Sequence, residues 1–262
     1  MSNPENPTQE LKNENFFERD EIDPVFPENV IRERTIDDAW RNTIWCCVRN
    51  GYRYDIKKGS YEGQERLQLP DARIIIEEPW TRPLSVTVPE HLGFTPPTDD
   101  EKIEKYFAEY LMSGEKEETE DYTYGEYITK QWERAVDLLA SSQGATNQCC
   151  ITIGDAESIS LNDPPCLRSI SFKSIPREGE LPKLQMSVFF RSWDLFTGFP
   201  ENIGGFQMLK ELMIIELMNK GFEVEDGPIV AFSDGVHIYE QYYPLVNNLN
   251  VDQIRLNEED EG

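Results

Sequence analysis

The sequence predicts an α/β or α+β domain in which a β-sheet packs against a long buried helix. Strand-like apolar runs alternate with helical patterns along most of the chain, and the helical pattern at residues 202–219 is long and apolar. Of the 262 residues, 38% are hydrophobic and 11% aromatic, which is enough for a sizeable core. A sheet with one apolar face needs a second layer, and such a helix supplies it.

The N-terminal half predicts helices around one strand-like segment. Thr35 suits the N-cap of a helix that continues to Val48. Residues 66–77 are strand-like and end before Pro79. The elements expected next are a proline-rich loop at 80–98, a helix from Asp99 to Leu111, an acidic loop at 113–121 and a helix from Tyr127 to Leu139.

The C-terminal half is richer in strands. The predicted strands are Cys150–Ile153, Leu167–Phe172, Leu184–Phe190 and Ile229–Phe232. The helix from Asn202 to Asn219 should stop near Gly221, since glycine commonly ends helices. The two flanking segments are polar and acidic, which is typical of chain without a core. We therefore expect a mobile acidic tail at 1–30, one folded domain at 31–246 and an acidic tail at 247–262.

The charge balance argues against one class of function. Lys and Arg number 25 and Asp and Glu number 50, so the net charge is −25. A protein that wraps nucleic acid needs a basic face, and the sequence therefore predicts no nucleic-acid partner. A small anionic ligand is still compatible with this balance, because a few clustered arginines can dominate one pocket.

The five cysteines indicate a reducing compartment. Their number is odd, four of them form two adjacent pairs, and no signal-peptide pattern precedes them. Their spacing matches no zinc motif and the chain has two histidines, so we expect no metal site. No apolar run reaches the roughly 18 residues that a membrane helix needs. The sequence predicts a cytoplasmic protein without a membrane partner.

One cysteine stands out by its context. Asp163-Pro164-Pro165-Cys166 places it behind two prolines at the start of a predicted strand. Fixed placement near positive charge favours a thiolate nucleophile, and Arg168 is a candidate source of that charge. A buried structural cysteine is the alternative, and this segment alone favours the alternative.

Two further segments carry candidate ligand groups. Arg191 and Ser192 follow a predicted strand, where a guanidinium fork and a hydroxyl suit a phosphate. Asn202 opens the long helix, and by itself it is equally consistent with an N-cap. His237 and Tyr239 are two residues apart, so in a strand they face the same side and can share a ligand. Core packing is the alternative for both.

Taken together and in this order, these segments resemble the thymidylate synthase family, in particular its archaeal, methanogen-type branch. The resemblance is strongest over residues 163–243, where a proline-preceded Cys, Arg-Ser-x-Asp, Gly-x-Pro-x-Asn and His-x-Tyr follow one another. Tyr122-Thr123-Tyr124-Gly125 is similar to the family's Tyr-Gly element. Thr146-Asn147-Gln148 is similar to the archaeal branch.

The resemblance implies a fold and a role for each site residue. The fold is a bent mixed sheet with a long buried helix, and the sheets of a homodimer pack face to face. Cys166 is the implied nucleophile. By the same resemblance, Tyr124 lines the site near C5, Arg191 and Ser192 hold the nucleotide phosphate, Asp194 helps to organise the base site, Asn202 reads the base, and His237 and Tyr239 bond the deoxyribose hydroxyl.

These residue types suit attack on uracil. A thiolate that adds to C6 makes C5 reactive and places negative charge on O4, where a hydrogen-bond donor is stabilising. The oxygen of an Asn202 amide can accept from N3–H of uracil while its nitrogen donates to O4. Cytosine has the reverse pattern at these atoms. Asn202 therefore favours a uracil nucleotide over a cytosine one, and the resemblance implies dUMP as the substrate.

Several departures from the bacterial pattern concern the phosphate and the cofactor. The paired arginine that crosses the dimer is missing, because the matching region reads Thr146–Cys150. The tryptophans of the bacterial folate site have no counterpart in the shortened segment 112–121, and the C-terminal closure is also missing. The implied donor is therefore 5,10-methylenetetrahydrofolate or methylenetetrahydromethanopterin. Glu104 and Glu109 are both candidates for the glutamate that relays protons.

The leading interpretation is a thymidylate synthase whose catalytic domain, residues 31–246, reductively methylates dUMP to dTMP with a reduced pterin. The alternative is a hydroxymethylase acting on dUMP, dCMP or CMP, in which water in place of hydride quenches the intermediate. A third interpretation is a non-catalytic binding protein, for example one that regulates its own message, and the negative charge argues against it.

Overall fold

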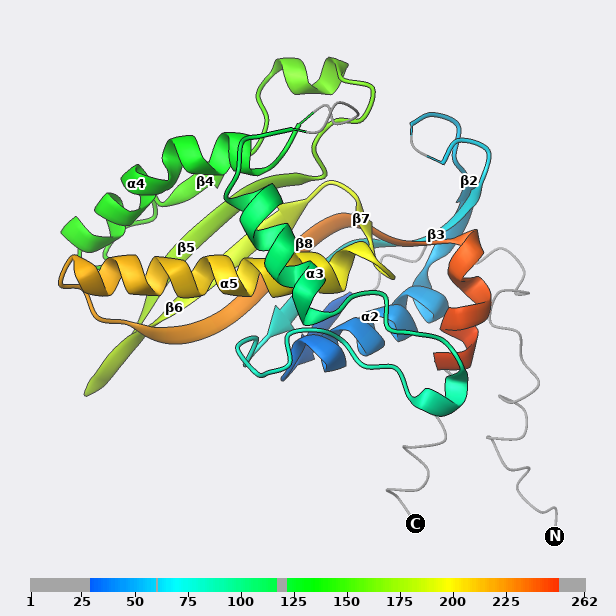
Figure 1. Ribbon diagram of the computed structural model, residues 1–262, viewed down its shortest axis with the longest axis horizontal. Coiled ribbons are helices and arrows are strands. Elements are labelled where there is room, and N and C mark those ends of the chain that lie inside the picture. The colour runs from blue at the N-terminus through cyan, green and yellow to red at the C-terminus, as the bar shows by residue number, and fades with distance from the viewer. Residues whose placement is uncertain (1–28, 60, 117–121, 250–262) are drawn as a thin grey trace, which may run out of the picture.

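A mixed β-sheet forms the framework of the protein, with α2, α4 and α5 against it (Figure 1). The computed structural model describes residues 29–59, 61–116 and 122–249. Within these ranges the sheet has eight strands. They are β1 (Val30–Glu33), β2 (Tyr52–Asp55), β3 (Glu65–Ile76), β4 (Cys150–Thr152), β5 (Leu167–Arg177), β6 (Glu180–Phe190), β7 (Trp193–Asp194) and β8 (Glu225–Tyr239).

The strand order places β8 near the centre. Along the sheet the order is β1-β3-β8-β6-β5-β4, while β2 pairs with β3 and β7 pairs with β8. β3 runs antiparallel to β8, and both β6 and β7 run parallel to it. The last residues of β8 are therefore flanked by β3, which carries β2, on one side and by β7 on the other. This end of the sheet gathers residues from four strands.

The helices are set by local signals in the sequence. Thr35 and Asp38 form a capping box at the start of α2, in which each side chain accepts a hydrogen bond from the other's backbone N–H. The helices are α2 (Ile36–Asn50), α3 (Asp100–Lys105), the π-helical turn η2 (Tyr106–Leu111), α4 (Gly125–Ser141) and α5 (Gly198–Asn219). Short 3-10 turns occupy Glu90–Leu92, Glu157–Ser160 and Glu240–Tyr242.

The core lies between α5 and the sheet. Leu184, Met186, Val188 and Phe190 alternate along β6 and are at most 1% exposed, as expected for a strand with one buried face. Burial of each such side chain contributes about 1.5–3 kcal/mol. α5 faces them with its own apolar residues, and these fully buried side chains include Phe199, Phe206, Leu209 and Met213.

Two glycines allow α3 and η2 to approach α5 closely. A Cβ at Gly204 would lie 2.7 Å from the Ile103 side chain, and a Cβ at Gly205 would lie 2.5 Å from the ring of Tyr106. The sequence predicted one regular helix across 99–111, whereas the structure changes to a π-helical turn at Tyr106. This close contact sets Tyr106 against the N-terminal part of α5.

The mixed α+β class is confirmed, and most predicted elements are present with different ends. β5 continues to Arg177 and β6 already begins at Glu180. The two strands therefore form a longer hairpin than the apolar runs indicated. β8 covers 15 residues, although only Ile229–Phe232 was predicted. The sequence did not predict β1, β2 or β7, which are short and depend on pairing with β3 and β8.

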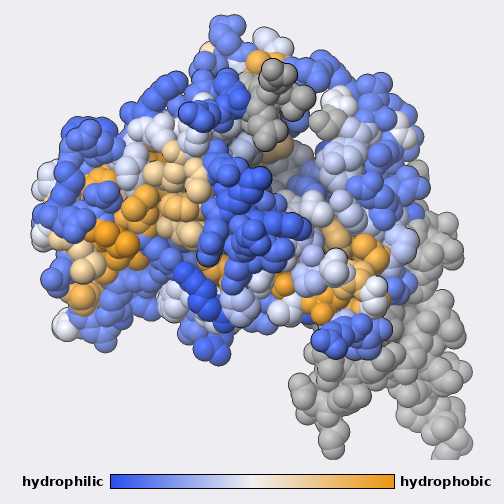
Figure 2. All heavy atoms as spheres, in the orientation of Figure 1, coloured by the Kyte–Doolittle hydropathy of each residue, from blue (hydrophilic) through white to orange (hydrophobic). Residues whose placement is uncertain are grey.

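The sheet face opposite the helices carries both polar and apolar side chains. Val30 is 52% exposed and Phe232 and Ile175 are each 40% exposed. Figure 2 shows a second group of apolar side chains over α4 and α5, where Ile215 and Met218 are exposed. In the part of the chain described here, no helix is long and apolar enough to cross a membrane. Most of the predicted tails, 1–30 and 247–262, lies outside the described residues.

Candidate active site

Cys166 stands immediately before β5, and Arg191 holds the loop that leads to it. The Arg191 Nε donates to the Pro165 carbonyl at 3.1 Å, and its Nη2 donates to the Pro164 carbonyl and lies 3.4 Å from a carboxylate oxygen of Asp163. The Arg191 backbone N–H also donates to the Cys166 carbonyl at 2.9 Å. One arginine therefore fixes both the loop and the backbone of the cysteine.

Opposing effects act on the Cys166 thiol. Burial raises its pKa above the ordinary value, and the carboxylate of Asp163 raises it further, while the positive charges of Arg191 and Arg66 lower it. The sequence suggested Arg168 as the source of charge, but the groups that act are Arg191 and Arg66. A thiolate is thus favoured by two arginines and opposed by desolvation.

A wall of tyrosines borders the cysteine. Tyr124 is 5% exposed, and its hydroxyl accepts a hydrogen bond from the Leu167 backbone N–H at 3.2 Å. The rings of Tyr110 and Tyr122 lie 5.1 Å and 5.7 Å from the ring of Tyr124, centre to centre. A glycine must follow Tyr124, because a Cβ at Gly125 would fall 2.0 Å from a carbonyl oxygen in the preceding loop. The Tyr-Gly pair therefore positions an aromatic hydroxyl beside Cys166.

His237 presents an unpaired acceptor. Burial lowers its pKa to about 3, so the ring is neutral at physiological pH. Its Nδ1 lies 3.1 Å from the Gly235 carbonyl, which accepts only from N–H, so the proton resides on Nδ1. The buried Nε2 has no partner among the described residues. A ligand hydroxyl can donate to it, and Ser192 Oγ approaches the same ring at 3.5 Å from Nδ1.

A polar network on β2 and β3 surrounds Tyr239. The register pairs Arg66 with Tyr239 and Gln68 with His237. Arg66 donates from Nη2 to the Tyr239 hydroxyl and from Nη1 to the Tyr54 hydroxyl, both at 3.1 Å. The Tyr54 hydroxyl donates to the Gln68 side-chain oxygen at 3.0 Å. Behind Tyr239 and His237, a second layer of polar side chains therefore lies on β2 and β3.

Asn202 and Asp194 belong to the turn that leads into α5. α5 begins at Gly198, so the N-cap interpretation of Asn202 is wrong, and its Oδ1 instead accepts from the Trp193 indole N–H at 2.9 Å. Asp194 accepts from the backbone N–H of Phe196 at 3.0 Å and from the hydroxyl of Thr197. Burial raises the Asp194 pKa. Asp194 therefore shapes the turn that presents Asn202.

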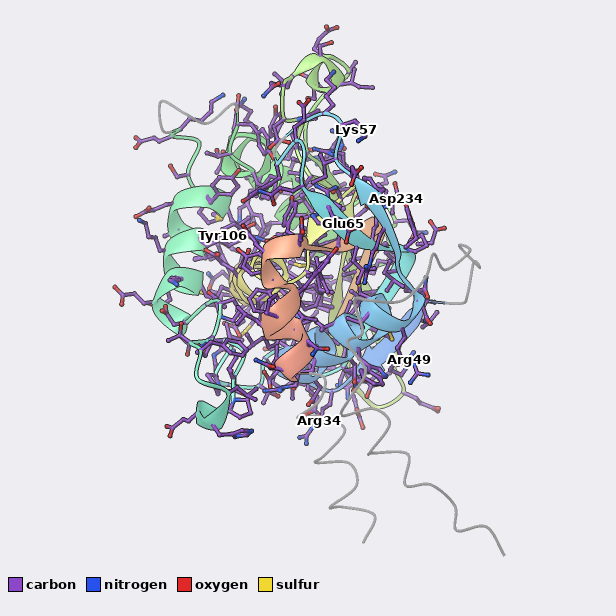
Figure 3. All side chains as sticks on the ribbon, turned by 90° about the vertical axis from the view of Figure 1, so that its right-hand side faces the viewer. Arg34, Arg49, Lys57, Glu65, Tyr106 and Asp234 are labelled. Carbon is purple, nitrogen blue, oxygen red and sulfur yellow. The ribbon has the colours of Figure 1, made fainter. Side chains whose placement is uncertain are left out.

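A cavity of about 580 Å³ opens between α3, η2 and the start of α5. It is lined by Lys102, Lys105, Tyr106, Glu109, Tyr110, Ser113, Glu115, Lys116 and Glu201. Burial raises the pKa of Glu201, which Lys102 partly offsets. Glu109 lies on this wall and pairs with Lys105 at 3.6 Å, whereas Glu104 is exposed and does not line it. Figure 3 shows Tyr106 on the α3 side of the molecule and Glu65, the neighbour of Arg66, on the β2–β3 side.

The family model described as thymidylate synthase matches residues 115–255, which is more than half of the chain. The chain belongs to the thymidylate synthase family. A search of curated proteins gave no match. The matched span contains all eight residues that the sequence assigned to the site: Tyr124, Cys166, Arg191, Ser192, Asp194, Asn202, His237 and Tyr239.

The thymidylate synthase match supports enzyme chemistry of the methyltransferase type, and the geometry shows which assigned residues lie together. Ser192, His237 and Tyr239 meet at the end of β8, because β7 and β8 run side by side there. Arg191 reaches the Cys166 loop. Throughout the described ranges, no group of three or more His, Cys, Asp or Glu side chains is arranged to hold a metal ion.

The sequence did not by itself single out three groups near the candidate site, Arg66, Tyr106 and Glu201. Arg66 precedes the matched span and is the first residue of the strand predicted at 66–77. Tyr106 falls inside the helix predicted from Asp99 to Leu111, and Glu201 is an unspecified position of the Gly-x-Pro-x-Asn pattern. The signals in the sequence were the alternating polar residues of β3, for Arg66, and the adjacent Gly204 and Gly205, which allow Tyr106 to approach α5 closely.

Proposed function

We propose that the protein is a thymidylate synthase that reductively methylates dUMP to dTMP. The observation that carries the proposal is that Arg191 holds the Cys166 loop while the next residue, Ser192, approaches the ring of buried His237, whose Nε2 is unpaired among the described residues, inside a span that matches this family. A neutral buried imidazole acceptor suits a sugar hydroxyl, and a thiol whose pKa, raised by burial, is lowered by the charges of two arginines suits nucleophilic attack.

The proposed reaction begins at the pyrimidine ring. The Cys166 sulfur bonds to C6, and the electron pair of the C5–C6 double bond moves toward O4, which makes C5 nucleophilic. The Asn202 amide nitrogen donates to O4, because its oxygen is already directed toward the Trp193 N–H. A donor aimed at developing charge is worth about 3 kcal/mol in comparable oxyanion sites.

The cavity beside Tyr106 is the proposed site of the reduced pterin. Its volume of about 580 Å³ lies within the range of small-ligand sites, and Tyr106 and Tyr110 offer aromatic surface for a bicyclic ring. When bound, the pterin supplies the methylene carbon and, for a methyl product, the hydride. Glu201 is a half-buried carboxyl of this cavity whose pKa is raised by desolvation, so we add it to Glu109 as a candidate for proton transfer.

One observation favours a second candidate function. Lysine and glutamate side chains supply six of the nine residues that line the cavity, so its wall is hydrophilic. Water that reaches the activated methylene would give a hydroxymethyl product in place of a methyl product. A pyrimidine nucleotide hydroxymethylase is therefore the alternative, with the same Cys166 addition step.

We also propose a homodimer that uses the sheet face opposite the helices. Exposed Val30, Phe232 and Ile175 lie on that face, and a sheet with apolar residues on its open side is stabilised by a second layer. Size determination in solution should give twice the chain mass of 30.4 kDa. A monomer at micromolar concentration would contradict this part of the proposal.

Product analysis by mass spectrometry tests the reaction. The protein is incubated separately with dUMP, dCMP and CMP, each with methylenetetrahydrofolate or with methylenetetrahydromethanopterin. A methyl product from dUMP with formation of the oxidised dihydropterin supports thymidylate synthesis. A hydroxymethyl product without pterin oxidation supports the alternative. The absence of any product with both pterins would refute both proposals.

A further inference from the structure

Arg66 is a half-buried cation that has no carboxylate partner among the described residues. It lies near the start of β3 and donates to two tyrosine hydroxyls, while its guanidinium centre lies 5.0 Å from the centre of the Tyr239 ring. Its Nε is buried and has no hydrogen-bond partner among the described residues. The carboxylate next to it in sequence, Glu65, instead faces Arg53 at 3.7 Å.

This arrangement is unusual for a chain of this charge. With 50 acidic residues in the sequence, an arginine whose role is structural would readily find an acid. Three other half-buried arginines, Arg41, Arg177 and Arg191, do so, with Asp37, Glu225 and Asp163. Arg168 is also half-buried and, among the described residues, has no ion pair, but unlike Arg66 it is not bonded to the candidate sugar-binding tyrosine. A partly buried cation with spare N–H donors is costly unless an anion meets it.

The position of Arg66 indicates what that anion is. Arg66 faces Tyr239 across the β3–β8 pairing, and His237 lies two residues along the same strand. The charge of Arg66 acts on Cys166, His237 and Tyr239, lowering the pKa of each, which places it at the sugar side of the candidate site. The guanidinium and the unpaired His237 Nε2 therefore border the same space.

We propose that Arg66 binds the 5′-phosphate of the pyrimidine nucleotide. The inference rests on the proposed function for the identity of the nucleotide, but the anion-binding role of Arg66 stands on the contacts above. Five N–H donors in a planar fork match phosphate oxygens, and two of them are already directed by tyrosines.

Tyr54 acts as a positioning residue in this proposal. Its hydroxyl accepts from Arg66 and donates to Gln68, which in turn donates to Tyr52 at 2.7 Å. This chain of hydrogen bonds holds the guanidinium by neutral groups, so its charge is not cancelled. A purely structural arginine would not need an uncharged support of this kind.

The test separates phosphate binding from support of Tyr239. Calorimetry measures the affinities of wild type, Arg66→Gln and Arg66→Lys for dUMP and for deoxyuridine. Arg49→Gln is the matched control, because Arg49 also lies over an aromatic ring, that of Trp45 at 5.2 Å, and its loss changes net charge equally. In Figure 3, Arg49 lies well away from Glu65, the residue beside Arg66.

We expect Arg66→Gln to weaken dUMP binding by about 10- to 100-fold, the range for one charge-assisted hydrogen bond, and to leave deoxyuridine binding within about twofold. Arg66→Lys, which keeps the charge but not the fork, should fall between. Arg49→Gln should bind both ligands as wild type does. An equal loss for dUMP and deoxyuridine in Arg66→Gln and Arg66→Lys would overturn the proposal and assign Arg66 a structural role.

A second probe keeps the two proposals distinguishable. Inorganic phosphate is titrated against each protein and followed by phosphorus NMR. If wild type binds phosphate and Arg66→Gln does not, the anion role holds even where no uracil nucleotide binds, and only the proposed function fails. If wild type and Arg66→Gln bind phosphate equally, or neither binds phosphate or dUMP, the anion role of Arg66 is refuted.

Discussion

The hydrogen bond from Trp193 to Asn202 predicts how the site chooses its base. An indole N–H is only a donor, so the Asn202 amide must direct its oxygen toward it, at 2.9 Å. The amide nitrogen is then available as a donor to O4 of uracil. Cytosine has a donor at that atom, and it would require the amide to turn over.

The cost of turning the amide follows from this contact. A reversed amide would place its NH₂ group against the Trp193 N–H, which leaves two donors facing each other without an acceptor. Leaving a buried polar group unsatisfied costs about 1–3 kcal/mol, which corresponds to a preference of about 5- to 150-fold for dUMP over dCMP. Trp193→Phe removes the N–H, so this part of the preference should disappear.

The replacement is designed to keep the packing. Trp193 stacks on Phe190 with ring centres 4.0 Å apart and nearly parallel, and a phenylalanine can retain that stack. The assay is the ratio of kcat/KM for dUMP to that for dCMP, supported by the ratio of dissociation constants. The ratio should fall in Trp193→Phe chiefly because dCMP improves.

Trp40→Phe is the matched control for this experiment. The Trp40 indole N–H also makes one buried hydrogen bond, to the Leu195 carbonyl at 3.1 Å, but not to Asn202. This variant should lose stability while its dUMP to dCMP ratio stays at the wild-type value. An unchanged ratio in a folded Trp193→Phe protein would show that the indole does not fix the amide, and the reasoning would be wrong.

Three further predictions concern the cysteine, the histidine and the tyrosine wall. Cys166→Ser should lower turnover on the order of 10³-fold or more, whereas Cys150→Ser, at an exposed position of β4, should keep it in the same product assay. Because the pKa of His237 is about 3 in the folded protein and 6.5 in an ordinary setting, the unfolded chain binds a proton first as pH falls. The free energy of unfolding, measured in urea, should therefore fall as the pH is lowered from about 6.5 to 3, and it should fall less in His237→Gln than in wild type. Equal pH dependence of the unfolding free energy in the two proteins would contradict this. Tyr124→Phe removes the acceptor of the buried Leu167 N–H, so it should reduce the free energy of unfolding by about 1–3 kcal/mol, and an unchanged denaturation midpoint would argue against that hydrogen bond.

The sequence was most informative where one local signal decides the outcome. Thr35 begins α2 because its hydroxyl and the Asp38 carboxylate satisfy backbone groups only a turn away. The alternation of apolar residues likewise located β6. Such signals depend on neighbours in the chain, so a single sequence contains them in full.

It was less informative where distant segments decide. β1 and β2 each have four residues and form because β3 provides a partner along its length. Asn202 appeared as an N-cap because the sequence does not show that α5 begins one turn earlier or that Trp193 turns back to reach it. Arg66 was missed for the same reason, because its proposed role depends on its pairing with Tyr239 in another strand.

Burial raises the pKa of Cys166, and the two arginines whose charges lower it differ in a way that divides their proposed roles. Arg191 faces Asp163 and two proline carbonyls, so much of its charge and most of its donors serve the loop that holds the thiol. Arg66 is held by neutral hydroxyls and keeps both its charge and an unpaired Nε. In a protein of net charge −25, the uncancelled cation is the one that can draw in an anionic substrate. The family resemblance assigned the phosphate to Arg191 and Ser192; we propose instead that Arg191 chiefly positions the nucleophile and that Arg66 holds the phosphate.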